Sequence, residues 1–344
     1  MGRDNRFIMA LFGALAKGRV RDVPVTVMPR GMRAIVYERY GPPEVLEVRE
    51  LPSPAPLAGE VLISVRAAAL NPKDSLIRKG KFRRVTGTRF PRRLGYDVSG
   101  VVRAVGEGVT RLRAGDEVFG MKNGWAGGTV AEEVCVLERE LAVKPKGLSF
   151  EDAAAIPLAG LTALQALRDE GRVQPGQRVL INGGSGGVGV FGIQVARALG
   201  AHVTTTSSAR NLELCRSLGA QEAWDYAVQP GLADGAGWDV FFDVFGNRSF
   251  GQARRALGPK GTYVSTVPGA PLVVLHFATR FLSRRARQVV VKSNTRDLEQ
   301  LAKWVEAGSL RAVIDRVVAL DEVAAGQAHL ETKRARGKVV VRVT

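Results

Sequence analysis

Hydrophobic residues follow two different patterns on either side of residue 148. Before it, short apolar runs rich in β-branched residues are separated by glycine and proline, which is typical of a β-rich domain. After it, apolar runs alternate with stretches of helical spacing, which is typical of a parallel sheet with helices on both faces. The sequence therefore predicts an α/β protein with a β-rich first part and a doubly wound second part.

The pattern also places the individual elements. Strands are expected at residues 33–37, 60–68, 98–105, 117–119 and 130–136. Helices are expected at 153–156 and 161–168, interrupted at Pro157, and later at 188–199, 212–218, 250–257 and 297–307. Further strands are expected at 178–181, 202–206, 240–243, 262–264 and 338–343.

A glycine-rich turn follows the strand expected at 178–181. It contains Gly184, Gly186 and Gly189 in the spacing G-x-G-x-x-G, directly before an expected helix. Glycines there let the backbone approach a pyrophosphate, whose charge the free amides of the helix start can hold. The loop therefore predicts a dinucleotide coenzyme.

The next strand predicts which dinucleotide binds. Chains that bind NAD place a carboxylate about 20 residues further on, where it accepts from the ribose 2′-hydroxyl. Here Ser207, Ser208 and Arg210 supply hydroxyls and a guanidinium, and the first acid is Glu213. This set suits a 2′-phosphate, so NADPH is favoured over NADH. The alternative for Arg210 is a solvated residue at a helix start.

Composition and charge limit the remaining possibilities. A chain of 344 residues exceeds what one hydrophobic core usually organises, so two domains are expected. Two cysteines exclude a disulfide framework and a four-cysteine zinc site, and they indicate a reducing compartment such as the cytoplasm. The net charge is +17, and basic residues are concentrated in two segments: a basic run at residues 78–93, which has no acid, and a basic cluster at 280–287. Both attract phosphate-bearing ligands.

The first 31 residues form a separate segment. Residues 7–16 are apolar, but a bilayer span needs about 20 residues, so no membrane span is expected. The basic residues before this stretch, and Ala14 and Ala16 at its end, are similar to a cleaved leader, which leaves export or the mitochondrial matrix as alternatives. We favour an extension or a start at Met32, because the rest of the chain is typical of an intracellular protein.

Several motifs occur in an order that resembles the medium-chain dehydrogenase/reductase superfamily, above all its zinc-free quinone oxidoreductase (zeta-crystallin-like) and enoyl reductase branch. They are Asn-Pro-Lys-Asp at 71–74, Gly-Tyr-Asp-Val-Ser-Gly at 95–100, Pro-Leu-Ala-Gly-Leu-Thr-Ala at 157–163, the glycine loop, Leu-Gly-Ala at 218–220 and Arg-Gly-Lys at 336–338. The resemblance implies a GroES-like β-barrel catalytic domain of residues 32–157 and 297–344, and a Rossmann NADPH-binding domain of residues 158–296. It also implies an active site in the cleft and a homodimer through the coenzyme domain.

The same resemblance implies the site residues. The catalytic set is Asn71, Lys73, Asp74, Tyr96 and Asp97, with Asn71 bonded to the nicotinamide ribose or to the substrate oxygen. The two aspartates have an alternative structural role, as acceptors for loop amides or as partners of an arginine. The coenzyme set is Asn71, Thr162, Gly184, Ser185, Gly186, Gly187, Val188, Gly189, Ser207, Ser208, Arg210, Tyr226, Phe245, Gly246, Thr266, Pro268 and Lys338.

The resemblance implies that no metal is needed. Asn71 and Tyr96 stand where zinc alcohol dehydrogenases carry a cysteine and a histidine, and the three histidines are far apart in the sequence. Without a Lewis acid, hydride transfer suits an acceptor that is already electron-poor. Leu76 and Phe82 replace tyrosines of the relatives, which leaves Tyr96, Lys73 or bulk water as the proton donor.

These observations predict an NADPH-dependent reductase of electron-poor C=C bonds, with hydride added at the β-carbon. A short or branched enoyl-CoA is the first expectation, because its phosphates would suit the two basic segments. The alternative is a quinone or enone oxidoreductase. An RNA-associated or structural NADPH-binding protein is a candidate of another class. It is disfavoured because the basic run holds only Phe82 and Phe90 as aromatic residues for base stacking.

Overall fold

The computed structural model describes residues 28–229, 232–267 and 269–344, which form two compact units. Unit 1 comprises the chain up to Leu158 together with Ser293–Ala302 and Ile314–Thr344, and unit 2 comprises Ala159–Lys292 and Lys303–Val313. The sequence assigned all of 297–344 to the first domain, so the grouping of 303–313 with unit 2 differs from that expectation. Most of the predicted N-terminal extension lies outside the described residues.

Unit 1 is built on two β-sheets. Its larger sheet has seven strands, with the order β15-β16-β3-β5-β6-β8 and with β7 also paired to β3. These strands are β3 (Glu60–Leu70), β5 (Asp97–Val105), β6 (Glu117–Met121), β7 (Glu133–Leu137), β8 (Leu141–Val143), β15 (Ile314–Ala319) and β16 (Lys338–Arg342). The smaller sheet has the order β2-β1-β4, from β2 (Glu47–Ser53), β1 (Met28–Tyr37) and β4 (Arg92–Arg93).

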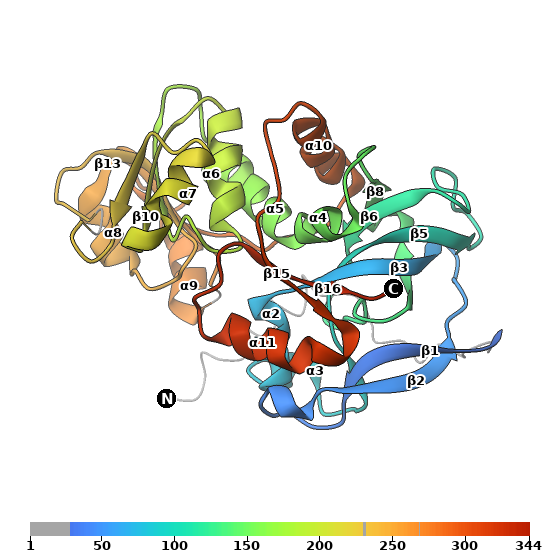
Figure 1. The fold of residues 1–344 in the computed structure, drawn as a ribbon. Coiled ribbons are helices and arrows are strands. Elements are labelled where there is room, and N and C mark those ends of the chain that lie inside the picture. Colours follow the sequence, from blue (N-terminus) through green and yellow to red (C-terminus); the bar gives the residue numbers. More distant parts are fainter. Residues whose placement is uncertain (1–27, 230–231, 268) are drawn as a thin grey trace. The chain divides into compact units, whose positions relative to one another are not determined.

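The register of the larger sheet gathers distant parts of the sequence. Antiparallel pairing sets Ala69 of β3 opposite Asp97, the first residue of β5. On the other side of β3, Val339 of β16 lies opposite Leu70. Figure 1 shows β16 next to β3. The end of β3 therefore lies beside the starts of β5 and β16, and the chain continues from β3 directly into a helix.

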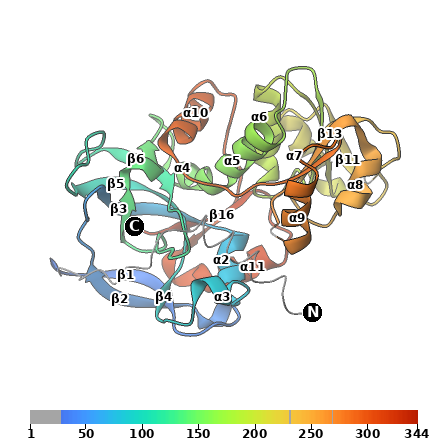
Figure 2. The ribbon, with the colours of Figure 1, turned by 180° about the vertical axis from the view of Figure 1, so that it is seen from behind.

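Helices close the ends of unit 1. They are α2 (Pro72–Arg78), α3 (Arg83–Thr86), α4 (Phe150–Ala155), α11 (Val323–Glu331) and, continuing into unit 2, α5 (Pro157–Leu164) and α10 (Thr295–Glu306). Figure 2 shows α2 next to α11. The guanidinium of Arg78, fully buried, pairs with Glu331 and donates to Gln327 Oε1 at 3.0 Å. This contact fixes α2, which begins at the predicted Asn-Pro-Lys-Asp motif.

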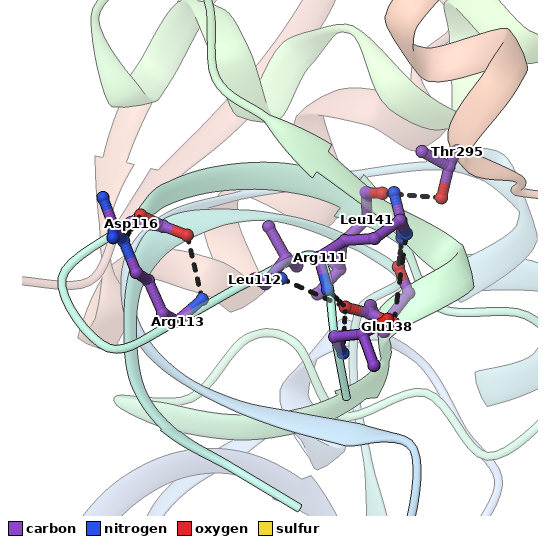
Figure 3. A network of polar contacts seen from close by, with 8 residues as sticks. Arg111, Leu112, Arg113, Asp116, Glu138, Leu141 and Thr295 are labelled. Carbon is purple, nitrogen blue, oxygen red and sulfur yellow. Dashed lines mark hydrogen bonds and ion pairs between the residues drawn. The ribbon is translucent and has the colours of Figure 1, made fainter. Parts of the chain in front are cut away.

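A carboxylate organises the loop between β5 and β6 (Figure 3). Glu138 Oε1 accepts from the backbone amides of Thr110, Arg111 and Leu112, and Arg111 donates back to the Glu138 carbonyl at 2.8 Å. Three amides on one oxygen replace the ladder bonds that an irregular loop lacks. This loop therefore holds its shape by hydrogen bonds between its backbone and one side chain.

Unit 2 is a six-stranded sheet in which every pair of neighbouring strands is parallel. Its order is β11-β10-β9-β12-β13-β14, from β9 (Arg178–Asn182), β10 (His202–Ser207), β11 (Glu222–Asp225), β12 (Trp238–Asp243), β13 (Leu257–Ser265) and β14 (Arg285–Gln288). The connecting helices include α6 (Gly189–Ala198), α7 (Leu212–Ser217), α8 (Phe250–Ala256) and α9 (Ala270–Ala278). From β9 the chain adds β10 and β11 on one side and then β12, β13 and β14 on the other. In such sheets ligands bind beyond the carboxyl ends of the strands, at the point where the strand order reverses.

The predicted doubly wound sheet is confirmed, and so are its strands at β9, β10, β12 and β13. The sequence missed β14, because its residues Arg285–Gln288 alternate basic and small or polar side chains instead of apolar ones. It also missed α9, whose apolar residues follow a proline and show little separation of polar and apolar faces. Within the described ranges, no helix has the length and apolar character needed to cross a bilayer.

Candidate functional site

Unit 1 holds a buried polar cluster at the end of β3. Asn71 follows β3, Asp97 begins β5 and Lys338 begins β16, so the sheet register described above brings the three together. All three are at most 3% exposed. The sequence predicted each of them as a site residue, and the structure places Lys338 against Asn71 and Asp97.

The Asn71 side chain already makes nearly all the hydrogen bonds that an amide can make. Its Nδ2 donates to Asp97 Oδ2 at 2.9 Å and to the Ala69 carbonyl at 3.2 Å, and its Oδ1 accepts from Lys338 Nζ at 2.5 Å. An amide has two N–H donors and two acceptor lone pairs. One lone pair of Oδ1 therefore remains, and Asn71 can offer a ligand an acceptor but no donor.

Asp97 links this cluster to the next helix. Its Oδ2 lies 3.2 Å from Lys338 Nζ, and its Oδ1 accepts from the Leu158 amide at 2.7 Å, at the start of α5. A carboxylate so deep in the protein requires such partners, because an unpaired buried charge is strongly unfavourable. The Leu158 amide belongs to a helix, so this contact differs from the alternative role predicted for this aspartate, as an acceptor for loop amides.

Lys73 lies on the face of an aromatic ring. Its Nζ is 3.6 Å from the centre of the Tyr96 ring and donates to the Gly124 carbonyl at 2.9 Å. Burial lowers the pKa of Lys73 to about 8. The Tyr96 hydroxyl donates to the Trp125 carbonyl at 3.0 Å, and burial raises the pKa of this phenol well above its usual value. Of these two groups, Lys73 releases a proton far more readily near neutral pH.

Asp74 is buried beside a small pocket. Its Oδ2 accepts from the Asn71 amide at 2.7 Å, while its Oδ1 has no hydrogen-bond partner among the described residues. The pocket, about 10 Å³ in volume and lined also by Tyr37, Arg92 and Tyr96, has room for one water molecule. Burial raises the pKa of Asp74 to about 7, although the Asn71 amide opposes this shift. Asp74 therefore carries a proton over much of the acidic range.

The glycine loop of unit 2 is shaped by close approaches. A Cβ at Gly184 would lie 2.0 Å from Thr205 Oγ1, and one at Gly189 would lie 2.1 Å from the Gly183 carbonyl oxygen. At Gly186 the nearest atom to such a Cβ, the Gly183 carbonyl oxygen, is 3.5 Å away, which is an ordinary van der Waals contact. Within the described residues, no side chain caps the start of α6 at Val188, next to Gly187. The Val190 amide of this helix start donates to the Gly186 carbonyl at 3.0 Å, and amides that lack such a partner at a helix start can bind an anion.

Ser185 of this loop is held by two side chains. Ser207 Oγ donates to Ser185 Oγ at 2.6 Å, and Asn211 Nδ2 donates to it at 3.1 Å. A hydroxyl that accepts two hydrogen bonds keeps its own proton to donate. Asn211, which sequence reasoning missed, is 5% exposed, and its Oδ1 has no partner in the described part of the chain. Ser208 and Arg210 lie nearby along the chain, and Arg210 is exposed.

The loops after β12 and β13 carry the other predicted coenzyme residues of unit 2. Phe245 is 48% exposed, and Thr266 Oγ1 donates to the Val244 carbonyl at 3.1 Å. Gly246 has a φ of +71°, a conformation that other residues rarely adopt. Tyr226, 54% exposed, follows β11, and its amide donates to the Ser207 carbonyl. Thr162 is buried in α5, and Pro268 lies outside the described residues.

Comparisons with known proteins agree with both units. An alcohol dehydrogenase GroES-like domain model matches residues 57–146, and a zinc-binding dehydrogenase model matches residues 218–341. The 2-methylene-furan-3-one reductase of Solanum lycopersicum is 38% identical over 328 residues, which cover 91% of this chain and 80% of the relative. The chain belongs to the medium-chain dehydrogenase/reductase superfamily.

Two further similarities place it within that superfamily. The chloroplastic NADPH-dependent alkenal/one oxidoreductase of Arabidopsis thaliana is 37% identical over 332 residues, covering 91% of this chain and 80% of the relative. The structure of a quinone oxidoreductase from Coxiella burnetii superposes with a TM-score of 0.85 at 35% identity, covering 92% of this chain and all of that one. This medium-chain reductase is an oxidoreductase of an NAD(P)H-dependent family, and the predicted combination of a GroES-like domain with a Rossmann sheet is confirmed.

The basic run of this medium-chain reductase is less exposed than its sequence indicates. Arg78 is buried, and Arg92 and Arg93 are half-buried, which leaves Lys79, Lys81, Arg83, Arg84 and Arg89 exposed. In the basic cluster, Arg280 is exposed, while Arg284 and Arg287 donate to backbone carbonyls. Among the described residues, no three histidine, cysteine or acidic side chains are grouped so as to hold a metal ion.

The raised pKa of Asp74 predicts a pH-dependent stability. The folded protein holds this proton at pH values where the unfolded chain has released it, so Asp74 lowers stability progressively as the pH rises from about 4 to about 7. Asp74→Asn keeps an acceptor for the Asn71 amide and removes the charge. We expect the unfolding free energy of the variant, relative to wild type, to increase by roughly 1 kcal/mol per pH unit in this range.

Urea denaturation of both proteins at pH 4.5, 6 and 8 measures this difference. Asp234→Asn, at an exposed position, is the control and should follow the wild type. Parallel stability curves for wild type and Asp74→Asn would contradict the prediction.

Proposed function

We propose that the protein is an NADPH-dependent reductase of C=C bonds conjugated to a carbonyl group, as in enones, alkenals and quinones. The observation that carries the proposal is the Lys73 ammonium on the Tyr96 ring, an acid with a pKa of about 8 beside a buried polar cluster. The similar proteins support it, because by name they are a 2-methylene-furan-3-one reductase, an alkenal/one oxidoreductase and a quinone oxidoreductase.

The reaction divides between coenzyme and protein. When bound, NADPH would supply a hydride for the β-carbon, and the carbonyl oxygen of the substrate would take up the displaced π electrons. For an enone, Lys73 then releases its proton to the α-carbon and becomes a neutral amine, which solvent protonates again. A lysine with a pKa near the working pH is suited to both steps. Tyr96 would act as the platform that holds the ammonium.

The residues of unit 2 fit a dinucleotide with a 2′-phosphate. The start of α6, which has no side-chain cap, and the proton that Ser185 keeps to donate would both serve a phosphate oxygen. The unpartnered Oδ1 of Asn211 would accept from a ribose hydroxyl. NADPH rather than NADH is supported by the exposed Arg210 and by the absence of an acid between Thr204 and Arg210.

Asn71 would bind the coenzyme and not the substrate oxygen. Its remaining polar capacity is one acceptor lone pair, which suits the hydroxyl of the nicotinamide ribose. A substrate carbonyl oxygen, which gains negative charge during reduction, needs a donor instead. Lys338 would act by holding the Asn71 amide in this orientation.

An enoyl-CoA stays a prediction for the substrate. It rested on the two basic segments, of which several arginines are buried or used in backbone contacts. Small conjugated carbonyl compounds and quinones are therefore preferred here. A cytoplasmic location likewise stays a prediction from cysteine usage.

We also infer a homodimer through unit 2. Strand β14 lies at the edge of the six-stranded sheet, where α9 packs against it and its Ala286 and Gln288 amides donate to the side chains of Thr279 and His276. Beside it, Phe277, Phe281 and Leu282 are 54%, 92% and 55% exposed. Large exposed apolar residues of this kind commonly mark an interface.

An acceptor panel tests the proposed function. Purified protein is given NADPH or NADH with methyl vinyl ketone, trans-2-hexenal, a benzoquinone and crotonyl-CoA, and the coenzyme is followed at 340 nm, about where reduced nicotinamides absorb. We expect oxidation of NADPH, faster than that of NADH, with the enone, the alkenal and the quinone. Turnover with crotonyl-CoA alone would contradict the preferred substrate class, and no turnover with any acceptor would contradict the proposed function.

The role of Lys73 predicts a pH profile. Because the acid must be protonated, kcat with the enone should fall as the pH rises through about 8. Lys73→Arg keeps the positive charge but releases no proton, so kcat should drop about 100-fold and the fall near pH 8 should disappear. The control is Lys81→Arg at an exposed position. An unchanged profile in Lys73→Arg would exclude the lysine as donor.

Sedimentation equilibrium tests the dimer. The full chain has a mass of 36.9 kDa, and we expect twice this mass in solution. Phe281→Asp should yield monomers without loss of folding, because this side chain is 92% exposed in the single chain. A dimer that persists in Phe281→Asp would place the interface elsewhere.

A further inference from the structure

Asp243 lies at the carboxyl end of β12, one of the two central strands of the sheet in unit 2. It is the last residue of β12, and the last residue of the neighbouring strand β9 is Asn182. These two strands are parallel, and the order in which the chain adds strands to the sheet changes direction between them. Asp243 is fully buried, and neither composition nor motif spacing indicated it.

Four donors converge on the Asp243 carboxylate. Oδ1 accepts from Asn182 Nδ2 at 2.7 Å and from the Gly246 amide at 2.9 Å. Oδ2 accepts from the Arg248 amide at 3.1 Å and lies 2.9 Å from the Tyr263 hydroxyl, whose single proton is shared with the Arg248 carbonyl oxygen at 2.7 Å. Burial and the negative charge of Asp243 raise the pKa of Tyr263, so this phenol stays protonated and donating at any working pH.

The donors belong to three separate segments around the proposed coenzyme site. Asn182 directly precedes the glycine loop, and its Oδ1 accepts from Thr206 at 2.9 Å. The Gly246 and Arg248 amides belong to the loop that follows β12. Tyr263 lies on β13, ahead of the loop that carries Thr266. One carboxylate therefore connects the phosphate loop with both loops on the nicotinamide side.

The loop after β12 cannot adjust easily by itself. Gly246 has a positive φ, and a Cβ there would lie 2.1 Å from Cγ2 of Val267 in the loop after β13. Thr266 Oγ1 also donates to the Val244 carbonyl. The two loops are packed against each other, so a change at Asp243 would move both of them.

We propose that Asp243 is a positioning residue for the coenzyme, which sets the loops after β12 and β13 relative to the glycine loop. The inference rests on the proposed coenzyme site of unit 2. A carboxylate is needed because two of its four donors are backbone amides of one loop, and both oxygens must accept. An asparagine in its place has only one acceptor oxygen.

Three variants separate positioning from simple stability. Asp243→Asn should raise the Kd for NADPH about tenfold and its KM similarly, and it should change the KM for the acceptor less than twofold. The exchange Asn182→Asp with Asp243→Asn restores the side-chain bond between β9 and β12 but not the acceptors for the loop amides. It should recover thermal stability while NADPH binding stays weak. Tyr263→Phe keeps the hydrogen bonds from the Gly246 and Arg248 amides to the Asp243 carboxylate. It should lower Tm and leave the Kd for NADPH within twofold of the wild-type value.

The measurements are NADPH fluorescence titration, steady-state kinetics and thermal unfolding of the full chain. Wild-type affinity in Asp243→Asn, or recovery of both stability and affinity in the exchange variant, would overturn the positioning role. A wild-type protein that binds neither NADPH nor NADH would overturn the proposed coenzyme site itself, which is a different result.

Discussion

The pairing of Lys338 with Asp97 is the contact on which the candidate site of unit 1 depends. Neither group tolerates burial alone, because an isolated charge in the interior is several kcal/mol less stable than in water. Together, with Asn71 between them and the Leu158 amide on the other carboxylate oxygen, they form a satisfied network. The network exists only in one register of β3, β5 and β16, since a slip by one residue would turn these side chains to the other face.

Burial shifts the pKa values of two adjacent residues in opposite directions. Lys73 and Asp74 follow each other at the start of α2, yet burial moves their pKa values toward each other, to about 8 and about 7. Tyr96 is common to the surroundings of both side chains: the Lys73 ammonium lies over its ring, and the same residue helps to line the pocket beside Asp74. In water at neutral pH both side chains would be fully ionised. Burial brings both pKa values close to 7, where a group can take up and release a proton, as acid catalysis requires.

Much of this could be predicted from the sequence, for identifiable reasons. The glycine loop and the strands around it are visible in short stretches of sequence. At positions 184 and 189 the neighbouring atoms are so close that a side chain would not fit, so glycine is required there. Asn71, Asp97 and Lys338 were found through motifs, although their mutual contacts depend on strand register and not on spacing. Asn211 and Asp243 gave no signal, since an isolated polar residue at a strand or helix end is ordinary in sequence. The burial of Arg78 could not be seen either, because its partner Glu331 lies 253 positions away.

Strand β16 has a further meaning for the making of the protein. Lys338 stands 267 positions after Asn71, so during synthesis the first barrel strands leave the ribosome long before the cation that completes their polar cluster. Until then Asp97 has no ammonium beside it, and the end of β3 lacks its neighbour. In the nascent chain the Asp97 carboxylate is therefore more stable in contact with water, whereas in the folded protein it is buried. Unit 1 is therefore completed late, by the arrival of strand β16.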